Sequence, residues 1–414
     1  RSVGYGGLLI PLVTVLVATT LLPVLLSTVG PRLDWPRHGH SDRPSRLWAA
    51  WARSVVRRRW LAAGAAMLVL GALLFPLHSL MLGDPSPDAL TTAGSAYQGL
   101  RALETSGIGA GVLDPIEVLS TPTAAALVAR LSQVEGVRGT VAPAAPAWRH
   151  GGTALIDVLP AADSTSASGH ATLDRVRRVA HAGSAPARVG GLAASDADFI
   201  AAVYDSFPLM VGLIALVTFV LLMRAFRSLL LPLKAILLNV LSVGAAWGAM
   251  KLVWQDGHGS GQLWGIAATG SISSWIPLMV FAFLFGLSMD YEVFILARMR
   301  EEYDRTGSTS AAVVRGIGHT GRLVTSAALI LVLAFVALAA IPMTDTKVMA
   351  TGLAAGILLD ATVVRMLLVP ALVSLFGRWN WWLPALPARL LRVQPSPAHM
   401  GLTGMGEASA VNAA

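Results

Sequence analysis

The stretch Phe283-Leu-Phe-Gly-Leu-Ser-Met-Asp-Tyr-Glu-Val-Phe-Ile-Leu-Ala297 decides how the rest of the chain is interpreted. It is long and apolar, as a membrane helix is, yet it contains Asp290, Tyr291 and Glu292. A carboxylate in a membrane helix costs roughly 3 kcal/mol or more, so such a residue usually faces protein or water and has a function. The other segments are interpreted as the scaffold that holds this one.

The composition is typical of an integral membrane protein. Of the 414 residues, 55% are hydrophobic and 13% are charged, whereas soluble domains contain about 25% charged residues. The net charge of +8 raises nucleic-acid binding, but the positive residues cluster at the ends of apolar segments and no recognition motif accompanies them. The chain has no cysteine, which excludes disulfides and thiolate metal sites. We expect no cofactor, no metal and no nucleic-acid partner.

Seven segments reach the ~20 apolar residues that span a bilayer, near 4–30, 60–82, 207–223, 230–253, 274–297, 323–343 and 348–376. The sequence therefore predicts a membrane α-helical bundle of about seven transmembrane helices with one outer domain. The predicted order is a transmembrane helix (1–30), a cytoplasmic basic linker with an interfacial helix (31–59), a transmembrane helix (60–82), an extracytoplasmic domain (83–206), a five-helix bundle (207–376) and a cytoplasmic tail (377–414).

Charge in the short loops sets the predicted orientation. Residues 224–234 contain Lys and Arg, residues 298–322 contain five Arg, and residues 254–273 contain neither. Positive loops stay in the cytoplasm, so residues 83–206 are predicted to lie outside the plasma membrane.

The outer segment is predicted to be an α+β domain. Strands are expected at 115–120, 137–142, 153–159 and 187–190, with helices from Thr121-Pro122 to Val134 and at 171–182. The order strand, helix, strand, strand, helix, strand is the ferredoxin-like arrangement.

The two ends of the chain resemble each other. Identical residues recur when Pro23, Leu25, Ser27, Gly30 and Trp35 are aligned with Pro370, Leu372, Ser374, Gly377 and Trp382. Chance similarity between two helix ends is the alternative. If the match is real, the protein is a tandem repeat of about 350 residues, and parallel repeats are a known feature of transporters. Residues 1–36 would then end a first copy and 37–384 would form the second. Residue 1 is Arg and no signal peptide follows it, so we expect the chain to begin inside a longer protein.

Asp290 and Tyr291 are the candidate proton-relay residues. Neighbouring residues point about 100° apart around a helix, so one can face a partner helix and the other a water path. Burial favours the neutral form of a carboxylic acid, which lets it take up and release a proton, and a tyrosine hydroxyl can relay that proton. The alternative is that Asp290 only pairs with a cation and fixes helix packing. Glu292 is expected to be a surface charge.

Asp360 and Arg365 lie within the last predicted span. Five residues apart, they lie about 140° apart around an α-helix and need not pair with each other. An ion pair of Arg365 with Asp290 or Glu292 is left open as an alternative.

Other polar and small residues have supporting roles. Asn239 and Ser326 are candidates for interhelical hydrogen bonds, although most such residues serve only packing. Close helix contacts are expected at Gly244, Gly248, Gly286, Gly352 and Gly356.

Two aspartates in membrane helices also raise the hypothesis of an intramembrane aspartyl protease, which needs two carboxylates that share a proton. The residues around Asp290 and Asp360 lack the Gly-x-Gly-Asp setting of such proteases. The sequence has no histidine cluster, phosphate loop or Walker sequence, so direct ATP use is not expected. We therefore expect that the protein is not an enzyme.

The segment from Gly286 to Glu302, with the sequence GLSMDYEVFILARMREE, resembles the tenth transmembrane helix of the mycobacterial membrane protein large (MMPL) family. This family belongs to the resistance–nodulation–division superfamily of exporters. Gly321–Ala328 and the stretch from Gly356 through Arg365 and Pro370 to Trp382 are similar to the same family. The resemblance covers residues 1–384.

The resemblance implies export of lipids or other hydrophobic compounds across the cytoplasmic membrane, driven by the proton-motive force. Members have twelve helices in two halves, each with a porter domain, and Asp-Tyr pairs in helices four and ten carry the protons. Only the second pair, Asp290-Tyr291, is present here. We therefore expect a C-terminal half whose partners are a lipid substrate, membrane lipids, protons and a missing N-terminal half, with homo-oligomerisation left open. The rival is a non-transporting scaffold whose outer domain binds a partner or lipid.

Overall fold

The computed structural model describes residues 2–29, 44–85, 89, 94–121, 125–164, 166–182 and 187–393. The chain divides into two compact units, Arg1–Arg43 and Pro44–Ala414, and each is described by itself. Part of the predicted basic linker, the repeat positions Gly30 and Trp35, and the end of the predicted tail lie outside the described residues.

The first unit contains α1 (Ser2–Thr19) and α2 (Leu21–Thr28). Residues Leu9–Thr28 form an apolar segment of 20 residues, long enough to cross a membrane. The hydroxyl groups of Thr14 and Thr20 donate to the carbonyls of Ile10 and Leu16 in the preceding turn. These bonds satisfy the few polar groups of the helix internally, as an apolar environment requires.

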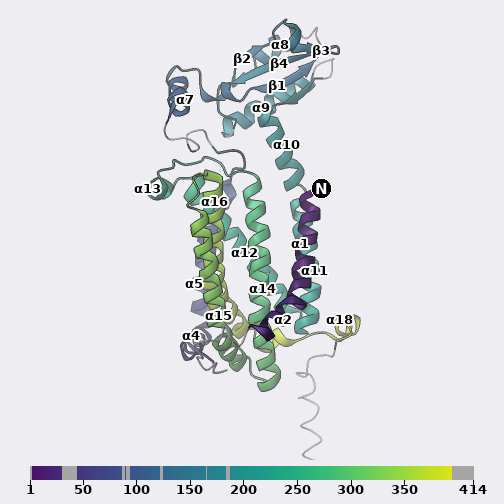
Figure 1. Ribbon diagram of the computed structural model, residues 1–414, viewed down its shortest axis with the longest axis vertical. Helices are drawn as coiled ribbons and strands as arrows, with labels where there is room; N and C mark the ends of the chain where they lie inside the picture. The colour runs from purple at the N-terminus through teal and green to yellow at the C-terminus, as the bar shows by residue number, and fades with distance from the viewer. Residues whose placement is uncertain are drawn as a thin grey trace, which may run out of the picture. The chain divides into compact units, whose positions relative to one another are not determined.

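The second unit contains the helical bundle and a small α+β domain (Figure 1). Among the described residues of the whole chain, seven helices are long and apolar enough to cross a membrane, which confirms the predicted membrane bundle. Six of these candidate spans belong to the second unit: Arg59–Ser79, Leu192–Phe226, Leu230–Gln255, Trp275–Thr306, Thr309–Leu338 and Thr344–Trp381.

Several of these spans contain more than one helical segment. The first is α5 (Arg59–Leu74) followed by the 3-10 helix η1 (Phe75–Ser79), and the second joins α10 (Leu192–Tyr204) to α11 (Phe207–Phe226). The third is α12 (Leu230–Met250) with the π-helix η4 (Lys251–Gln255). After the short α13 (Ser260–Trp264) come α14 (Trp275–Thr306) and α15 (Thr309–Leu338). The last span comprises α16 (Thr344–Leu359), the π-helix η5 (Asp360–Leu368), α17 (Val369–Phe376) and the 3-10 helix η6 (Gly377–Trp381), and α18 (Ala385–Leu390) follows it.

The helices extend beyond the apolar segments that predicted them. Residues 298–322, expected to be a loop, are largely helical: α14 continues to Thr306 and α15 begins at Thr309. Gly307, at φ 65°, ends α14, and the Ser308 hydroxyl accepts a hydrogen bond from the Ala311 amide to cap α15. Hydropathy marks the apolar length of a helix, whereas caps mark its ends.

Small residues bring the bundle helices together. A Cβ on Gly356 would lie 2.3 Å from Leu284, and one on Gly248 would lie 1.7 Å from the Leu73 carbonyl oxygen. The close contacts expected at Gly244 and Gly352 are present as well. The expectation was wrong for Gly286, because no atom lies within 4 Å of its Cβ position.

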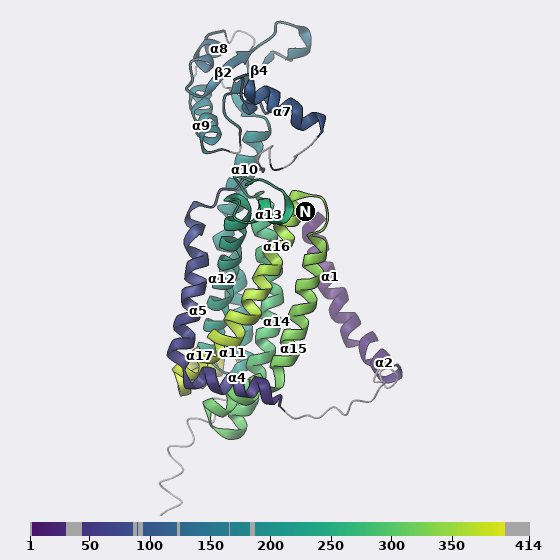
Figure 2. The same cartoon turned by 90° about the vertical axis from the view of Figure 1, so that its left-hand side faces the viewer.

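The helix α4 (Arg46–Arg57) lies across the ends of α5 and α15 (Figure 2). Its apolar face, with Ala52 and Val55 buried, packs on the bundle, and a Cβ on Gly321 would lie 2.7 Å from the Trp48 ring. The structure therefore gives the apolar face of this helix a protein partner. A location at the membrane interface stays a prediction.

The α+β domain is built on one antiparallel sheet with the strand order β2-β4-β1-β5. The strands are β1 (Ile116–Ser120), β2 (Val137–Val141), β4 (Thr153–Pro160) and β5 (Arg188–Gly190), and the two-residue β3 (Arg149–His150) pairs with β4. Helix α8 (Ala125–Ser132) follows β1, and α9 (Ala167–His181) follows β4. Before the sheet, the chain forms α7 (Ser95–Thr105) and the 3-10 helix η2 (Ala110–Leu113), and η3 (Pro146–Trp148) precedes β3.

Alternation along the strands gives this domain its own core. In β1, Ile116, Val118 and Ser120 are buried, and the residues between them are exposed. Val118 pairs with Ile156 of β4. Both side chains pack with Leu131 of α8 and Val176 of α9 in a cluster separate from the core of the bundle. Apolar residues with period two on strands and on one face of each helix therefore produce two layers.

Candidate functional site

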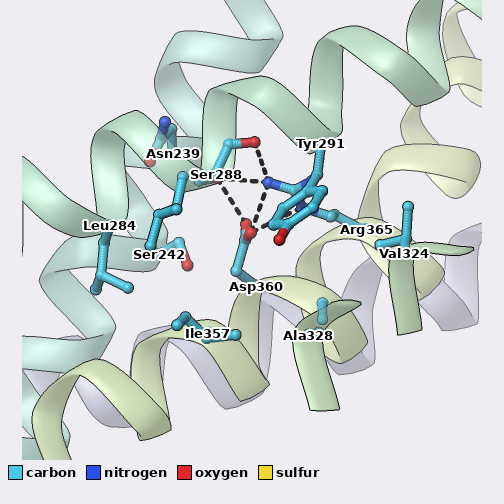
Figure 3. A pocket seen from close by; sticks show the side chains of 12 residues that line it. Asn239, Ser242, Leu284, Ser288, Tyr291, Val324, Ala328, Ile357, Asp360 and Arg365 are labelled. Atoms are coloured by element: carbon cyan, nitrogen blue, oxygen red, sulfur yellow. Dashed lines mark hydrogen bonds and ion pairs between the residues drawn. The ribbon is translucent and has the colours of Figure 1, made fainter. Parts of the chain in front are cut away.

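A cavity inside the bundle gathers the polar residues of the central helices. Its lining comes from α12, α14, α15, α16 and η5, and includes Asn239, Ser242, Ser288, Tyr291, Asp360 and Arg365 (Figure 3). The lining residues Leu284, Val324, Ala328 and Ile357 are apolar. The site is therefore a small polar cluster within a hydrophobic bundle.

Asp360 and Arg365 form an ion pair at its centre. Nη2 of Arg365 lies 2.6 Å from Oδ2 of Asp360, and Nε donates to the same oxygen at 2.7 Å. Ser288 of α14 joins the pair: its hydroxyl donates to Oδ1 of Asp360 at 3.0 Å, while Arg365 donates to the Ser288 hydroxyl and carbonyl. Asp360 is 7% exposed and Arg365 is 1% exposed. A charge pair this deeply buried needs such additional hydrogen bonds to offset its desolvation.

Arg365 forms its ion pair with Asp360, and not with Asp290 or Glu292, the partners that the sequence left open. Residues 360–368 form a π-helix, in which the backbone bonds run from residue i to i+5. Side chains at positions 360 and 365 are then stacked on one face, instead of about 140° apart as in an α-helix. The wider turn is the physical reason for the pairing.

Tyr291 and Asp290 point in different directions from α14. Tyr291 lines the cavity, and its ring lies 5.2 Å from the guanidinium carbon of Arg365 (Figure 3). Asp290 is exposed on the outer side of the helix, as are Phe283 and Phe294. Among the described residues, no hydrogen bond or ion pair reaches the Asp290 carboxylate. The proton-relay role of the two residues stays a prediction.

Glu292 is buried, contrary to the expectation of a surface charge. It is 4% exposed and lines a second cavity together with Lys234 of α12. Lys234 donates to Oδ1 of Asn380 and lies 5.2 Å from the Phe376 ring. Glu292 stands about 200° around the helix from Asp290, so it faces the bundle when Asp290 faces outward.

The two supporting residues proposed from the sequence differ in their surroundings. Asn239 is buried, donates to the Phe285 carbonyl at 3.1 Å and lines the cavity. Ser326 is exposed and donates to the Leu323 carbonyl of its own helix at 2.9 Å, so the structure does not bring it to the site. The sequence reasoning missed Ser288, although its spacing of four residues from Glu292 places both on the inner face of α14.

Trp51 of α4 is a second residue that sequence reasoning missed. Its indole nitrogen donates to the Met366 carbonyl at 2.8 Å, inside the π-helix and next to Arg365. The wider π turn changes which backbone groups pair with each other, and an outside donor satisfies one of them. The helix α4 therefore supports the segment that carries the ion pair.

Chemically, the site offers charged and hydroxyl groups but no metal-binding set. Among the residues that the structure describes, no group of three or more His, Asp or Glu side chains is arranged to hold a metal ion. The polar cavity wall, with a hydroxyl, an amide and an ion pair, can hydrogen-bond water.

Comparisons with known proteins agree on one family. The profile of the MMPL family matches residues 123–397. The chain is 36% identical over 422 residues to the "Heme uptake protein MmpL11" of Mycobacterium tuberculosis, covering 94% of this chain and 42% of that protein. It is also 36% identical over 404 residues to the "Mycolic acid-containing lipids exporter MmpL11" of Mycolicibacterium smegmatis, covering 92% of this chain and 42% of that protein.

A solved structure supports the fold. The crystal structure of a heavy metal efflux pump matches 79% of this chain and 52% of its own chain, with a TM-score of 0.51 and 12% sequence identity. The chain spans less than half the length of the two relatives named above. The profile matches more than half of the sequence, and both relatives align with nearly all of it. These matches lead to one assignment: this chain belongs to the MMPL family of membrane transport proteins.

Proposed function

We propose that the chain is part of an exporter that uses the proton-motive force to move lipids or other hydrophobic compounds across the cytoplasmic membrane. The observation that carries the proposal is the Asp290-Tyr291 pair on α14, which has one side chain on the open face of the bundle and the other against a buried ion pair. The names of the MmpL11 relatives, a lipid exporter and a heme uptake protein, are consistent with a hydrophobic substrate.

We assign residues 83–206 to an extracytoplasmic, ferredoxin-like porter domain. The strand order β2-β4-β1-β5 and the succession β1, α8, β2, β4, α9, β5 support this assignment. The positive charges in 224–234 and 298–322, against none in 254–273, support its location outside the cytoplasm. The apolar substrate would pass along this domain.

The exposed face of α14 calls for a further membrane partner. Asp290 shares this face with Gly286, where a Cβ would have open space, and with Phe283 and Phe294. An aspartate facing lipid is costly, so we propose that a helix of another half of the transporter covers it. The chain covers 42% of the length of its MmpL11 relatives, which leaves room for such a half.

The proposed coupling runs from Asp290 through Tyr291 to the ion pair. Protonation of Asp290 removes a charge on α14 and changes which partner helix packs best against this face. Tyr291 lies over Arg365, and Ser288 ties α14 to Asp360, so a shift of α14 disturbs the pair directly. The bundle then changes between two packings, and the porter domain follows.

The substitution Asp290→Asn in the full-length transporter tests the proposal. We expect proton-dependent export to be lost while membrane insertion and stability are retained, because asparagine keeps the shape but takes up no proton. Glu301→Gln, an exposed carboxylate of the same helix paired with Arg298, is the matched control and should leave export unchanged. If Asp290→Asn still exports its substrate with the same dependence on the proton gradient, the relay at Asp290 is wrong. A full-length parent protein that exports nothing would instead favour the non-transporting scaffold.

A further inference from the structure

The two connections between the porter domain and the bundle meet at one short segment. The entering chain, residues 81–84, leads from the bundle into the domain and pairs with Ile272. The Gly83 amide donates to the Ile272 carbonyl at 3.0 Å, and the Ile272 amide donates to the Met81 carbonyl at 2.9 Å. The leaving chain is held beside it, because the Tyr204 hydroxyl at the end of α10 donates to the Ser274 carbonyl at 2.8 Å. This segment leads directly into α14.

Two carboxyl groups bridge these connections on the domain side. Asp84 lies on the entering chain, and its backbone carbonyl accepts a hydrogen bond from the Ser271 hydroxyl at 2.5 Å. Asp196 lies on α10, two turns before Tyr204. The two residues line one cavity, where the carboxyl group of Asp196 is close enough to that of Asp84 to interact with it. A favourable contact between two carboxyl groups requires that they share a proton.

The surroundings of this pair are acidic. Asp163 follows β4 and contributes negative charge at Asp84, and the carboxylate of Asp345 at the start of α16 interacts with Asp84 as well. Asp345 is itself fixed by the Ser273 hydroxyl at 2.8 Å. The base that lines the cavity is His170 of α9, whose Nε2 lies 3.8 Å from the Cβ position of Gly83.

We propose that Asp84 and Asp196 form a proton-operated latch between the entering chain and α10. With one shared proton, the two carboxyl groups attract and hold α10 and the domain against the 271–274 segment. Without the proton, two carboxylates repel each other and the connection opens. The latch responds to the pH on the porter side and does not depend on a relay at Asp290.

The direction of the response follows from the titration of Asp84. Burial, the charge and hydrogen bond of Asp196, and the charge of Asp163 all raise the pKa of Asp84 above its ordinary value. A raised pKa means that the closed state binds the proton more tightly than the open state does. The closed state is therefore favoured at low pH and is lost as the pH rises through the raised value.

The absence of cysteine makes a direct distance measurement straightforward. Spin labels at Ala129→Cys on α8 and Gln262→Cys on α13, both exposed positions, report the distance between the domain and the bundle in the full chain reconstituted in nanodiscs. Pulsed electron paramagnetic resonance between pH 4 and 8 should show a narrow population at low pH and a longer, broader one at high pH. A one-proton latch changes their ratio by up to about tenfold per pH unit.

Variants of the carboxyl pair distinguish the latch from other causes. Asp196→Asn should keep the narrow population at every pH, because the amide donates to the Asp84 carboxylate without a titrating proton, and Asp84→Asn should do the same if the first variant folds poorly. Asp205→Asn removes an exposed carboxylate after the same helix and should follow the parent protein. Constant distances in the parent, or a parent-like response in both carboxyl variants, would overturn the latch. Loss of the pH response in His170→Gln alone would assign the response to the imidazole and would also overturn the latch.

Discussion

Asp360 and Arg365 are bonded at 2.6 Å although five positions separate them in the sequence. A second pair has the same spacing: Lys251 donates to both carboxylate oxygens of Asp256, at 2.8 and 2.6 Å, at the end of α12. Both pairs coincide with π-helical turns, η5 and η4. The i to i+5 periodicity of the backbone therefore places opposite charges together at two levels of the bundle.

Removing one partner of the central ion pair should lower the free energy of unfolding more than replacing both partners. Asp360→Leu or Arg365→Met leaves one buried charge without its partner, and we expect each to destabilise the protein by about 3–5 kcal/mol. The double substitution should cost less than the sum, because no uncompensated charge remains. Unfolding in detergent, analysed as a double-mutant cycle, measures the difference. Additive effects would show that the two residues do not depend on each other.

Loss of the Trp51 indole donor should loosen the π-helix. Trp51→Phe keeps most of the packing but leaves the Met366 carbonyl without its donor, which costs about 1–3 kcal/mol for a buried group. Hydrogen exchange of the amides in 360–368 should become faster. Trp60→Phe, at a position where the side chain is 74% exposed, is the control and should leave that exchange unchanged. Equal exchange in both variants would contradict this role.

A methyl group should not be tolerated where Gly248 of α12 meets α5. Gly248→Ala would place its Cβ 1.7 Å from the Leu73 carbonyl oxygen, so the backbone of one helix must move. Overpacking of this kind costs about 1–3 kcal/mol. In the control Gly64→Ala in α5, the new Cβ has no atom within 4 Å and the helix propensity rises. Its melting temperature should be unchanged or slightly higher. A Gly248→Ala variant as stable as the parent would show that the two helices can move apart at little cost in stability.

The stability of the α+β domain should depend on Asp157 of β4. One of its carboxylate oxygens is buried without a partner among the described residues, and burial raises the pKa of this group. The domain is then more stable when Asp157 is protonated, and this contribution is lost as the pH rises through the raised pKa.

Proteolysis of the folded protein at several pH values tests that dependence. Asp157→Asn should be more resistant than the parent at neutral pH, and the difference should shrink as the pH falls through the raised pKa. The control Asp174→Asn, on the exposed side of α9, should follow the parent at all pH values. A parent protein whose resistance does not change with pH would refute the role of Asp157.

Hydropathy and loop charge are local properties, and they are sufficient to predict the membrane bundle. A segment such as 274–297 is recognised by its own composition, because transfer of each residue into lipid depends little on its neighbours. The strands around Val118 and Ile156 are recognisable in the same way, from their alternation. The polar residues Asp290, Tyr291, Asp360, Arg365 and Asn239 stand out because each is costly in an apolar helix.

The tertiary structure decided which of these residues meet. Asp290 faces outward and Glu292 inward because helix packing fixed the rotation of α14, which a segment of uniform hydrophobicity leaves unspecified. Arg365 reaches Asp360 because a π turn changed the angular spacing, and Ser326 stays apart because its side of α15 is exposed. Composition determines that a helix enters the membrane, but the contacts between helices determine the direction in which each side chain points.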